Sequence, residues 1–302
     1  VFGEDPATSE PNQAKVIASL EKLDFLAVQE IFLTETAKLA DVVLPATTFA
    51  EKDGTFTNTE RRVQRVRKAI DPPGQAKPDW QILSLLSTAM GHPMSYAHAG
   101  EIFDEMASLT PSYGGMSYER IDEVGLQWPC PTPDHPGTRF LHEGQFTRGL
   151  GAFQEISFRP AAELPDEEYP YILSTGRTLY NYNIGNMTQK AGAIRQKQGR
   201  NFVELHEQDA AALGVADGDE VAVATRRGEV VVQARVGRRT RPGALWMPFH
   251  FAEQPTNRIT NDAFDNVTRT AEYKVCAARV VKAAPASASG SPRSATPPGG
   301  TR

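Results

Sequence analysis

The sequence is poor in the residues that bind metals. Its 302 residues include two cysteines, Cys130 and Cys276, which lie far apart and form no Cys-x-x-Cys pair. The six histidines never fall at the spacing of a metal-binding motif. Structural zinc sites and iron–sulfur clusters take most of their ligands from closely spaced cysteines and histidines. We therefore expect no metal site built by this chain alone.

The chain also lacks long apolar runs, a signal peptide and an excess of positive charge. No run approaches the ~18 apolar residues of a membrane-spanning helix, and no targeting segment opens the sequence. The net charge of −5 gives no sign of attraction to nucleic acid or to a membrane. We expect no transmembrane segment and no nucleic-acid partner. We expect a cytoplasmic location, and an export signal, if the protein has one, would lie in an upstream segment.

Hydrophobic residues make up 40% of the chain and charged residues 23%, as in soluble globular proteins. The length suffices for two domains at the usual ~100–200 residues per domain. The sequence starts abruptly with Val1-Phe2-Gly3-Glu4. We interpret it as the C-terminal part of a longer polypeptide.

The first part alternates between helical and extended patterns. Ser9 is a candidate N-cap, and apolar residues recur at helical spacing behind it. The expected elements are helices at 10–22 and 34–40, the latter capped by Thr34, and strands at 24–29 and 41–44. This order indicates an α/β layer with a parallel sheet.

Ligands of such sheets bind beyond the carboxyl ends of the strands. That rule directs attention to Gln29 and Glu30 and to the loop 51–58. Residues 79–90 predict an amphipathic helix. Residues 92–165 predict a long packed connection with short helices at 100–109 and 117–125, because they carry too many aromatic residues to be disordered.

A short apolar strand is expected at Tyr171–Leu173, followed by Ser174-Thr175-Gly176-Arg177. Backbone N–H groups, hydroxyls and a guanidinium directly after a strand can converge on a phosphate. An ordinary strand-to-loop exit is the alternative interpretation.

The rest of the second half predicts a closed β-barrel. A helix is expected at 206–213, ended by Gly214, and two strands joined by a glycine-containing turn form a hairpin. The expected strands after that helix are 220–225, 229–236, 244–248 and 273–280. The composition of 283–302 indicates a disordered tail.

These residues together resemble the molybdopterin oxidoreductase family, most closely the C-terminal part of the catalytic α subunit of formate dehydrogenases. The likeness covers roughly residues 1–282. In the first half it is carried by residues 28–37 and by ADVVLPATTFAEKDGTFTNTERRVQ (40–64). In the second half it is carried by STGR (174–177), LGVADGDEV (213–221), RRGEV (226–230), PFHF (248–251), NRITNDAFD (257–265) and EYKVCAARV (272–280).

The resemblance implies an α/β region followed by a double-psi-type six-stranded β-barrel that binds the molybdopterin dinucleotide. The implied divisions are 1–95 for part of the α/β domain, 96–165 for the connection, 166–282 for the barrel and 283–302 for the tail.

The resemblance also implies a function. The family reaction removes two electrons and a proton from formate, giving CO2, at a molybdenum or tungsten bis-molybdopterin guanine dinucleotide. Electrons pass through a [4Fe–4S] cluster, which would lie in the missing N-terminal part, and on to electron-transfer subunits. Alternatives are another superfamily oxidoreductase, such as a nitrate reductase, or a non-catalytic subunit that keeps the fold for assembly of a respiratory complex.

By the same resemblance, no catalytic or metal-ligating residue is expected in this chain, since those residues lie in earlier segments of the family. The residues carried over are cofactor-binding, with Arg177 the leading candidate: Gln29, Glu30, Thr34, Gly54, Thr55, Asn58, Arg61, Thr175, Gly176, Arg177, Tyr180, Tyr182, Met187, Thr188, His250, Asn257, Thr260, Tyr273 and Lys274. For Gln29 and Glu30 a solvated strand end, and for His250 a purely structural role, remain alternatives. The chain departs from the family at Asn181, Asn183 and Asn186, where relatives often carry histidine or threonine.

Overall fold

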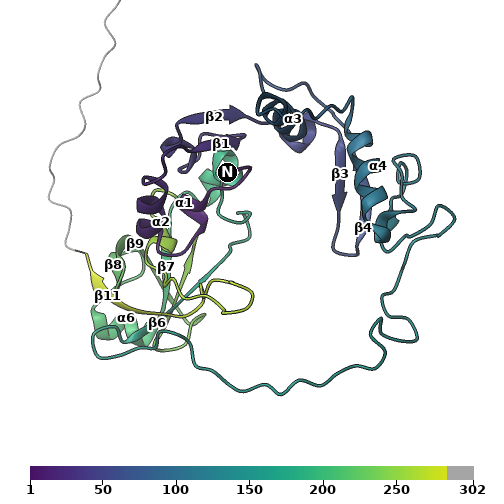
Figure 1. The fold of residues 1–302 in the computed structure, drawn as a ribbon. Coiled ribbons are helices and arrows are strands. Elements are labelled where there is room, and N and C mark those ends of the chain that lie inside the picture. Colours follow the sequence, from purple (N-terminus) through teal and green to yellow (C-terminus); the bar gives the residue numbers. More distant parts are fainter. Residues whose placement is uncertain (284–302) are drawn as a thin grey trace, which may run out of the picture. The chain divides into compact units, whose positions relative to one another are not determined.

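The computed structural model describes residues 1–283, so the tail expected over 283–302 lies outside the described residues except for Ala283. The chain divides into two compact units (Figure 1). Unit 1 consists of Val1–Thr8 and Lys15–Arg159, and unit 2 consists of Ser9–Ala14 and the chain from Pro160 onward. No helix within the described residues is long and apolar enough to cross a membrane.

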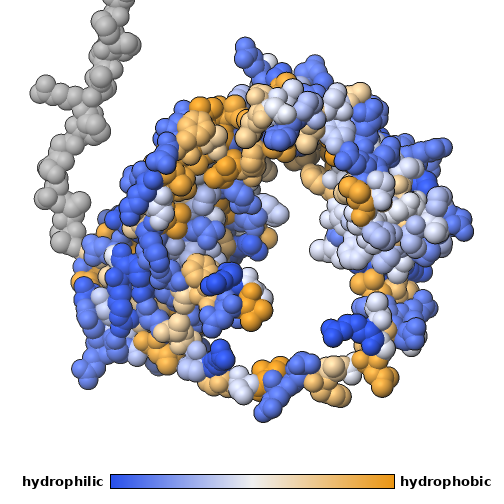
Figure 2. Space-filling view, viewed as in Figure 1, coloured by the Kyte–Doolittle hydropathy of each residue, from blue (hydrophilic) through white to orange (hydrophobic). Residues whose placement is uncertain are grey.

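Unit 1 contains a two-stranded parallel sheet, as the helix–strand alternation predicted. Strand β1 (Ala27–Glu30) pairs with β2 (Val42–Pro45) in the register Ala27↔Val42. Val28 is fully buried and packs in a cluster with Leu26 and Ala37. The β2 valines are exposed, and Figure 2 shows apolar side chains on the surface around this strand.

The helix expected at 10–22 is shorter than predicted. Helix α1 (Pro6–Ser9) ends at Ser9, and α2 (Gln13–Leu20) begins four residues later. Asn12 between them has a φ of 49°, which no helical residue adopts. The Ser9 carbonyl accepts hydrogen bonds from two side chains of unit 2, so it does not start a helix.

A second part of unit 1 is a three-stranded antiparallel sheet with the strand order β3-β4-β5. Its strands are β3 (Gly54–Thr57), β4 (Arg62–Val66) and β5 (Leu126–Gln127). The expectation of a plain loop at 51–58 was wrong, because the Thr-Phe-Thr stretch pairs with β4 in the register Thr55↔Arg65. A buried cluster beneath the sheet includes Val63, Phe103 and Ile121.

The helices of this region are mostly those predicted. They are α3 (Asp79–Ala89), α4 (Ala99–Leu109) and single 3₁₀ turns at Ala37–Leu39, Phe49–Glu51 and Pro111–Tyr113. Residues 117–125 form turns instead of the expected helix. They bury Ile121 and then turn at Gly125, whose φ of 69° leads the chain into β5.

Unit 2 is a closed six-stranded barrel with the strand order β10-β6-β11-β8-β9-β7. Its strands are β6 (Tyr171–Gly176), β7 (Phe202–His206), β8 (Glu220–Thr225), β9 (Gly228–Gly237), β10 (Ala244–Pro248) and β11 (Cys276–Lys282). The remaining elements are α5 (Gly192–Lys197), α6 (Glu207–Leu213) and 3₁₀ turns at Thr188–Lys190 and Thr256–Arg258. The closed barrel confirms the predicted architecture.

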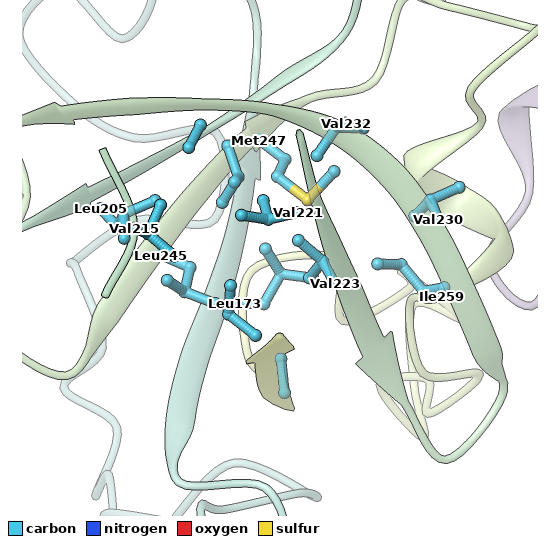
Figure 3. Close-up of a cluster of buried hydrophobic side chains, with 14 of the residues drawn as sticks. Leu173, Leu205, Val215, Val221, Val223, Val230, Val232, Leu245, Met247 and Ile259 are labelled. Carbon is cyan, nitrogen blue, oxygen red and sulfur yellow. The ribbon is translucent and has the colours of Figure 1, made fainter. Parts of the chain in front are cut away.

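The barrel interior holds the core of unit 2. Val230, Val232 and Ala234 of β9 are buried, and the two valines meet leucines from β6, β7 and β10 (Figure 3). Leu173, Val221 and Val223 are fully buried at its centre. Each such side chain contributes about 1.5–3 kcal/mol by leaving water, so the barrel is held by its interior and leaves outward-facing residues available for binding.

Two barrel strands differ from their predicted bounds. Strand β6 continues through Ser174-Thr175-Gly176, because these residues pair in parallel with Trp246–Pro248 of β10. The last strand begins at Cys276 and not at Tyr273. The carbonyls of Tyr273 and Val275 are taken by the side chains of Thr175 and Asn261, so this stretch does not join the ladder.

Candidate functional site in the loop after β6

The predicted anion loop leaves the barrel where β6 ends at Gly176. The Trp246 indole packs there so closely that a Cβ on residue 176 would lie 2.5 Å from its Nε1, and only glycine fits. Arg177 follows and is exposed. Its guanidinium carbon lies 6.0 Å from the centre of the Phe249 ring, and Lys274 Nζ lies 5.7 Å from the same ring. The loop after β6 and the stretch just before β11 thus bring two cations to one aromatic ring.

These two cations lack an acidic partner. Within residues 1–283, Arg177 makes no ion pair, and Lys274 donates only to the Thr175 carbonyl at 2.5 Å. Burial and the nearby charge of Arg177 lower the pKa of Lys274. Two cations that raise each other's energy favour an anion between them, and a guanidinium matches phosphate oxygens in particular.

His250 fixes the backbone of this loop. Its Nε2 accepts a hydrogen bond from the Thr178 N–H at 2.9 Å, and its Nδ1 lies in hydrogen-bond contact with the Asn183 carbonyl. The ring therefore acts as a neutral imidazole with Nδ1 as donor. Burial and the charge of Arg177 lower the pKa of His250, against the raising effect of the Asn183 bond.

Asn181 organises the middle of the loop. It is buried, and its amide donates to Thr178 Oγ1 and Gln198 Oε1. Its carbonyl oxygen accepts from Thr188 Oγ1 at 3.3 Å and from Gln189 Nε2 at 2.5 Å. An asparagine can make all these bonds because it both donates and accepts. The departure from the family at this position therefore has a structural role here.

Three other predicted residues of the loop face solvent, whereas Thr188 is half-buried. Tyr180, Tyr182 and Met187 are exposed on the loop surface. Gly185 has a φ of 84° and approaches the His250 backbone so closely that a Cβ would lie 2.6 Å from its carbonyl oxygen. The loop is thus anchored at His250 and presents its aromatic side chains outward.

Four further predicted residues tie the site to the barrel. Thr175 Oγ1 donates to the Tyr273 carbonyl at 2.9 Å, and the Tyr273 hydroxyl donates to the Ser9 carbonyl at 3.0 Å. Asn257 Nδ2 donates to the same Ser9 carbonyl, and Thr260 Oγ1 donates to the Asn257 carbonyl. Burial raises the pKa of Tyr273 to about 12. These hydrogen bonds hold the end of β6 and the segment that carries Lys274 in place.

The predicted residues of the parallel sheet lie together at the carboxyl end of β1. Gln29 is buried; its Nε2 donates to Asp79 Oδ1 at 2.7 Å, while its Oε1 has no hydrogen-bond partner within the described residues. Burial raises the pKa of Glu30, and the nearby Asp5, Glu4 and Asp79 carboxylates act in the same direction.

The helix expected at 34–40 with Thr34 as its cap is instead a 3₁₀ turn over Ala37–Leu39, whose N-cap residue is Thr36. Thr34 lies two residues before that cap, and its Oγ1 accepts from the Ala37 N–H at 3.2 Å. The unpartnered Gln29 oxygen nearby on the sheet edge is a buried acceptor that a ligand N–H group can satisfy.

The predicted residues of loop 51–58 and Arg61 lie on the β3–β4 hairpin. Gly54 and Thr55 belong to β3, and Asn58 closes the hairpin by accepting from the backbone N–H groups of Glu60 and Arg62. The Arg61 guanidinium donates to the carbonyls of Trp128 and Arg139. In this structure, Arg61 holds the connecting segment against the hairpin.

Sequence reasoning missed two features of the barrel site. Phe249, the ring shared by Arg177 and Lys274, was passed over as part of the PFHF motif. The outward residues of β9 and β10 were also missed, although the inward–outward alternation of a strand identifies them; those of β7 were missed because β7 itself was not predicted. No group of three or more histidine, cysteine, aspartate or glutamate side chains within residues 1–283 is placed to hold a metal ion.

The class of protein follows from comparison with known families. Residues 1–89 match the family described as Molybdopterin oxidoreductase, and residues 171–277 match the Molydopterin dinucleotide binding domain. The second match covers β6 to β10, the Arg177 loop and the first two residues of β11. The chain belongs to the molybdopterin oxidoreductase family.

Individual relatives give a more specific similarity than the family matches do. The chain is 51% identical over 286 residues to F420-dependent formate dehydrogenase 2 subunit alpha of Methanococcus maripaludis, covering 93% of this chain and 42% of that protein. It is 36% identical to formate dehydrogenase H of Escherichia coli, and the match covers 93% of this chain and 40% of that protein. The chain thus spans about two fifths of the length of these relatives.

A solved structure shares the fold. Acetylene hydratase from Pelobacter acetylenicus superposes with a TM-score of 0.68 at 19% sequence identity, covering 93% of this chain and 44% of that chain. The likeness supports the described folds of the two units, and at this identity it is evidence for the fold alone.

Proposed function

We propose that this chain is the C-terminal, cofactor-holding region of a formate dehydrogenase catalytic subunit. The support is its similarity to formate dehydrogenase α subunits over 93% of its length. The cofactor in this proposal is a molybdenum or tungsten bis-molybdopterin guanine dinucleotide. An iron–sulfur cluster and the metal-binding residue belong to a part of the protein outside this chain.

The observation that carries the proposal is the Arg177–Lys274 pair beside Phe249. Both cations lack an acidic partner within the described residues, and the loop that carries Arg177 is fixed by His250. A diphosphate offers the negative charge that this arrangement needs. When bound, the cofactor supplies the redox chemistry that removes two electrons and a proton from formate.

The residues of this chain bind and orient. Arg177 and Lys274 take phosphate oxygens, and Tyr180, Tyr182, Met187 and Thr188 line the loop around the pterin. In unit 1, Gln29, Glu30 and Thr34 take the polar edge of a nucleoside at the carboxyl end of β1. The unpartnered Gln29 Oε1 fits such a ligand, because a buried acceptor without a donor costs about 1–3 kcal/mol.

The substrate and partners follow from the same proposal. Formate is the substrate, and electron-transfer subunits receive the electrons. A non-catalytic copy of the fold would have no need for two unpaired cations at a fixed loop, which favours the enzyme reading over the assembly-subunit alternative.

Loss of the Arg177 guanidinium tests the proposal. In the full-length subunit, Arg177→Ala should lower the molybdenum or tungsten and guanine dinucleotide content of the purified enzyme several-fold, because one phosphate partner is gone. Metal analysis and nucleotide release after acid treatment measure both. Arg238→Ala is the matched control, since Arg238 is exposed and pairs with Glu207 at 2.8 Å. Unchanged occupancy in Arg177→Ala would remove this residue from the site.

A further inference from the structure

A second concave site lies on the outer face of the barrel beside the Arg177 loop. It is a cleft of about 570 Å³ over β7, β9 and β10, and its lining includes Lys197, Trp246 and Thr240. A smaller hollow of about 160 Å³ adjoins it and shares Arg235 and Arg239. The larger volume is in the range of small-molecule sites, which hold roughly 300–1,000 Å³.

The cleft is strongly cationic in a chain whose net charge is −5. Its lining has four cationic side chains and one carboxylate, Glu204. Glu204 is paired with Arg239 at 3.1 Å, and Arg239 remains mostly exposed. The other cations of the lining are Arg177, Lys197 and Arg235. An anionic ligand is therefore favoured over a neutral one.

The cleft also offers planar surfaces held in place. The Arg235 guanidinium carbon lies 3.4 Å from the centre of the Phe202 ring, so the cation packs against the ring, and the Arg235 residue is exposed. The Trp246 ring packs 5.8 Å from the Phe202 ring. Ordering these groups in advance reduces the entropy that a ligand would lose on binding.

Two polar groups of the lining lack protein partners within residues 1–283. Trp246 lines the cleft and its indole N–H donates to no acceptor, and Thr240 Oγ1 is buried without a partner. An indole N–H and a hydroxyl without protein partners match a ring-shaped ligand that carries both hydrogen-bond acceptors and donors.

We propose that this cleft binds a planar ring that carries phosphate or carboxylate groups, such as a mononucleotide. The ring stacks on Arg235 beside Trp246, and its anionic group is taken by Arg239 and Lys197. The cleft shares Arg177 and Tyr180 with the loop of the proposed cofactor site, whereas Lys274, the second cation of that site, is not part of its lining. The inference does not depend on the identity of the cofactor.

The test is direct binding to the 302-residue chain, by calorimetry and by quenching of tryptophan fluorescence. Adenosine monophosphate represents a phosphate-bearing ring and benzene-1,3,5-tricarboxylate a carboxylate-bearing ring. Adenosine and inorganic phosphate are the controls for ring and charge alone. At least one ring anion should bind tenfold or more tighter than either control. Equal binding of phosphate and the ring anions, equal binding of adenosine, or no binding would each overturn the proposal.

Variants locate the site. Arg235→Ala should weaken binding of the ring anion tenfold or more, and Arg235→Lys should weaken it by less, since the charge stays and the stacked plane is lost. Trp246→Phe should remove most of the fluorescence change. Lys274→Ala and Arg238→Ala should leave binding unchanged. An effect of Lys274→Ala as large as that of Arg235→Ala would place the ligand in the cofactor site and overturn the inference.

Discussion

His250 acts in this structure through the loop backbone. Its neutral ring accepts from Thr178 N–H and contacts the Asn183 carbonyl, so both ends of the loop segment depend on one side chain. His250→Ala leaves both backbone groups without partners, at a cost of about 1–3 kcal/mol for each one that stays buried. We expect faster amide exchange across residues 177–183, measured by mass spectrometry. His92→Ala, at an exposed position, should change nothing there.

The same histidine gives the loop a pH dependence. Burial lowers the folded-state pKa of His250 below its ordinary value of 6.5, so the unfolded or released loop binds the proton more readily. The contribution of His250 is complete above that ordinary value and is lost as the pH falls through the lowered folded-state pKa. In the wild type, the protection of the Thr178 amide against hydrogen exchange, corrected for the intrinsic rate, should decrease as the pH falls through the folded-state pKa of His250. It should be independent of pH over the same range in His250→Ala.

At the residue scale, the motifs single out side chains but do not specify the contacts that these side chains make. Arg177 and Lys274 were placed by motif, and the structure brings both to Phe249. Asn257 and Tyr273 were also placed by motif, yet both bond to the Ser9 carbonyl. Such contacts join positions roughly 250 residues apart, and no local pattern encodes them.

Among the elements, the segment before β6 is attached to the barrel by Glu163. Its carboxylate accepts from Arg227 Nη2 at 2.9 Å and from the Ala277 N–H at 2.7 Å. Burial opposes the negative charge, but these bonds and the charges of Arg227 and Arg226 outweigh it and lower the pKa of Glu163. The bonds of Glu163 to Arg227 and Ala277 thus attach the segment before β6 to the β8–β9 hairpin and to β11.

Glu163→Gln should destabilise unit 2 by about 1.5–3 kcal/mol at neutral pH, the usual contribution of hydrogen bonds to charged groups. Because the folded-state pKa is lowered, this contribution is present above the ordinary glutamate pKa of 4.5 and is lost as the pH falls through the folded-state value. Urea unfolding near pH 7 and at acid pH measures it. The exposed pair Glu168–Arg279 provides the control: Glu168→Gln should cost no more than about 1 kcal/mol. Equal effects of the two variants would contradict the role of Glu163.

Elements with a strong local period were the ones predicted correctly. Helices α3 and α6 and strands β8 and β9 have clear apolar repeats and turn residues at their ends. Strand β7 was missed because it is five residues long, runs directly into α6, and finds its parallel partner in β9 farther along the chain. Closure of the barrel supplies the pairing that the local sequence does not specify.

For the whole molecule, the two units differ in what they contribute to the proposed enzyme. Unit 1 places polar groups at the end of a two-stranded sheet, and unit 2 places cations on a closed barrel. The described residues contain no cluster of metal ligands, and the chain spans 42% of its relative from Methanococcus maripaludis. In the function proposed above, the residues that hold the redox centre belong to a part of the protein outside this chain.

Expressed alone, the 302-residue chain should be folded and inactive in formate oxidation with a viologen dye. The barrel core, closed on itself and filled by Leu173, Val221 and Val223, should give a cooperative unfolding transition by circular dichroism. The full-length subunit, loaded with its cofactor and assayed in parallel, should turn over formate. Measurable turnover by the 302-residue chain would mean that the chemistry resides here, and the division between cofactor holding and catalysis would have to be abandoned. If the chain is inactive but unfolds cooperatively, loss of the fold cannot explain the missing activity. That result would support cofactor binding, and not catalysis, as the role of these two units.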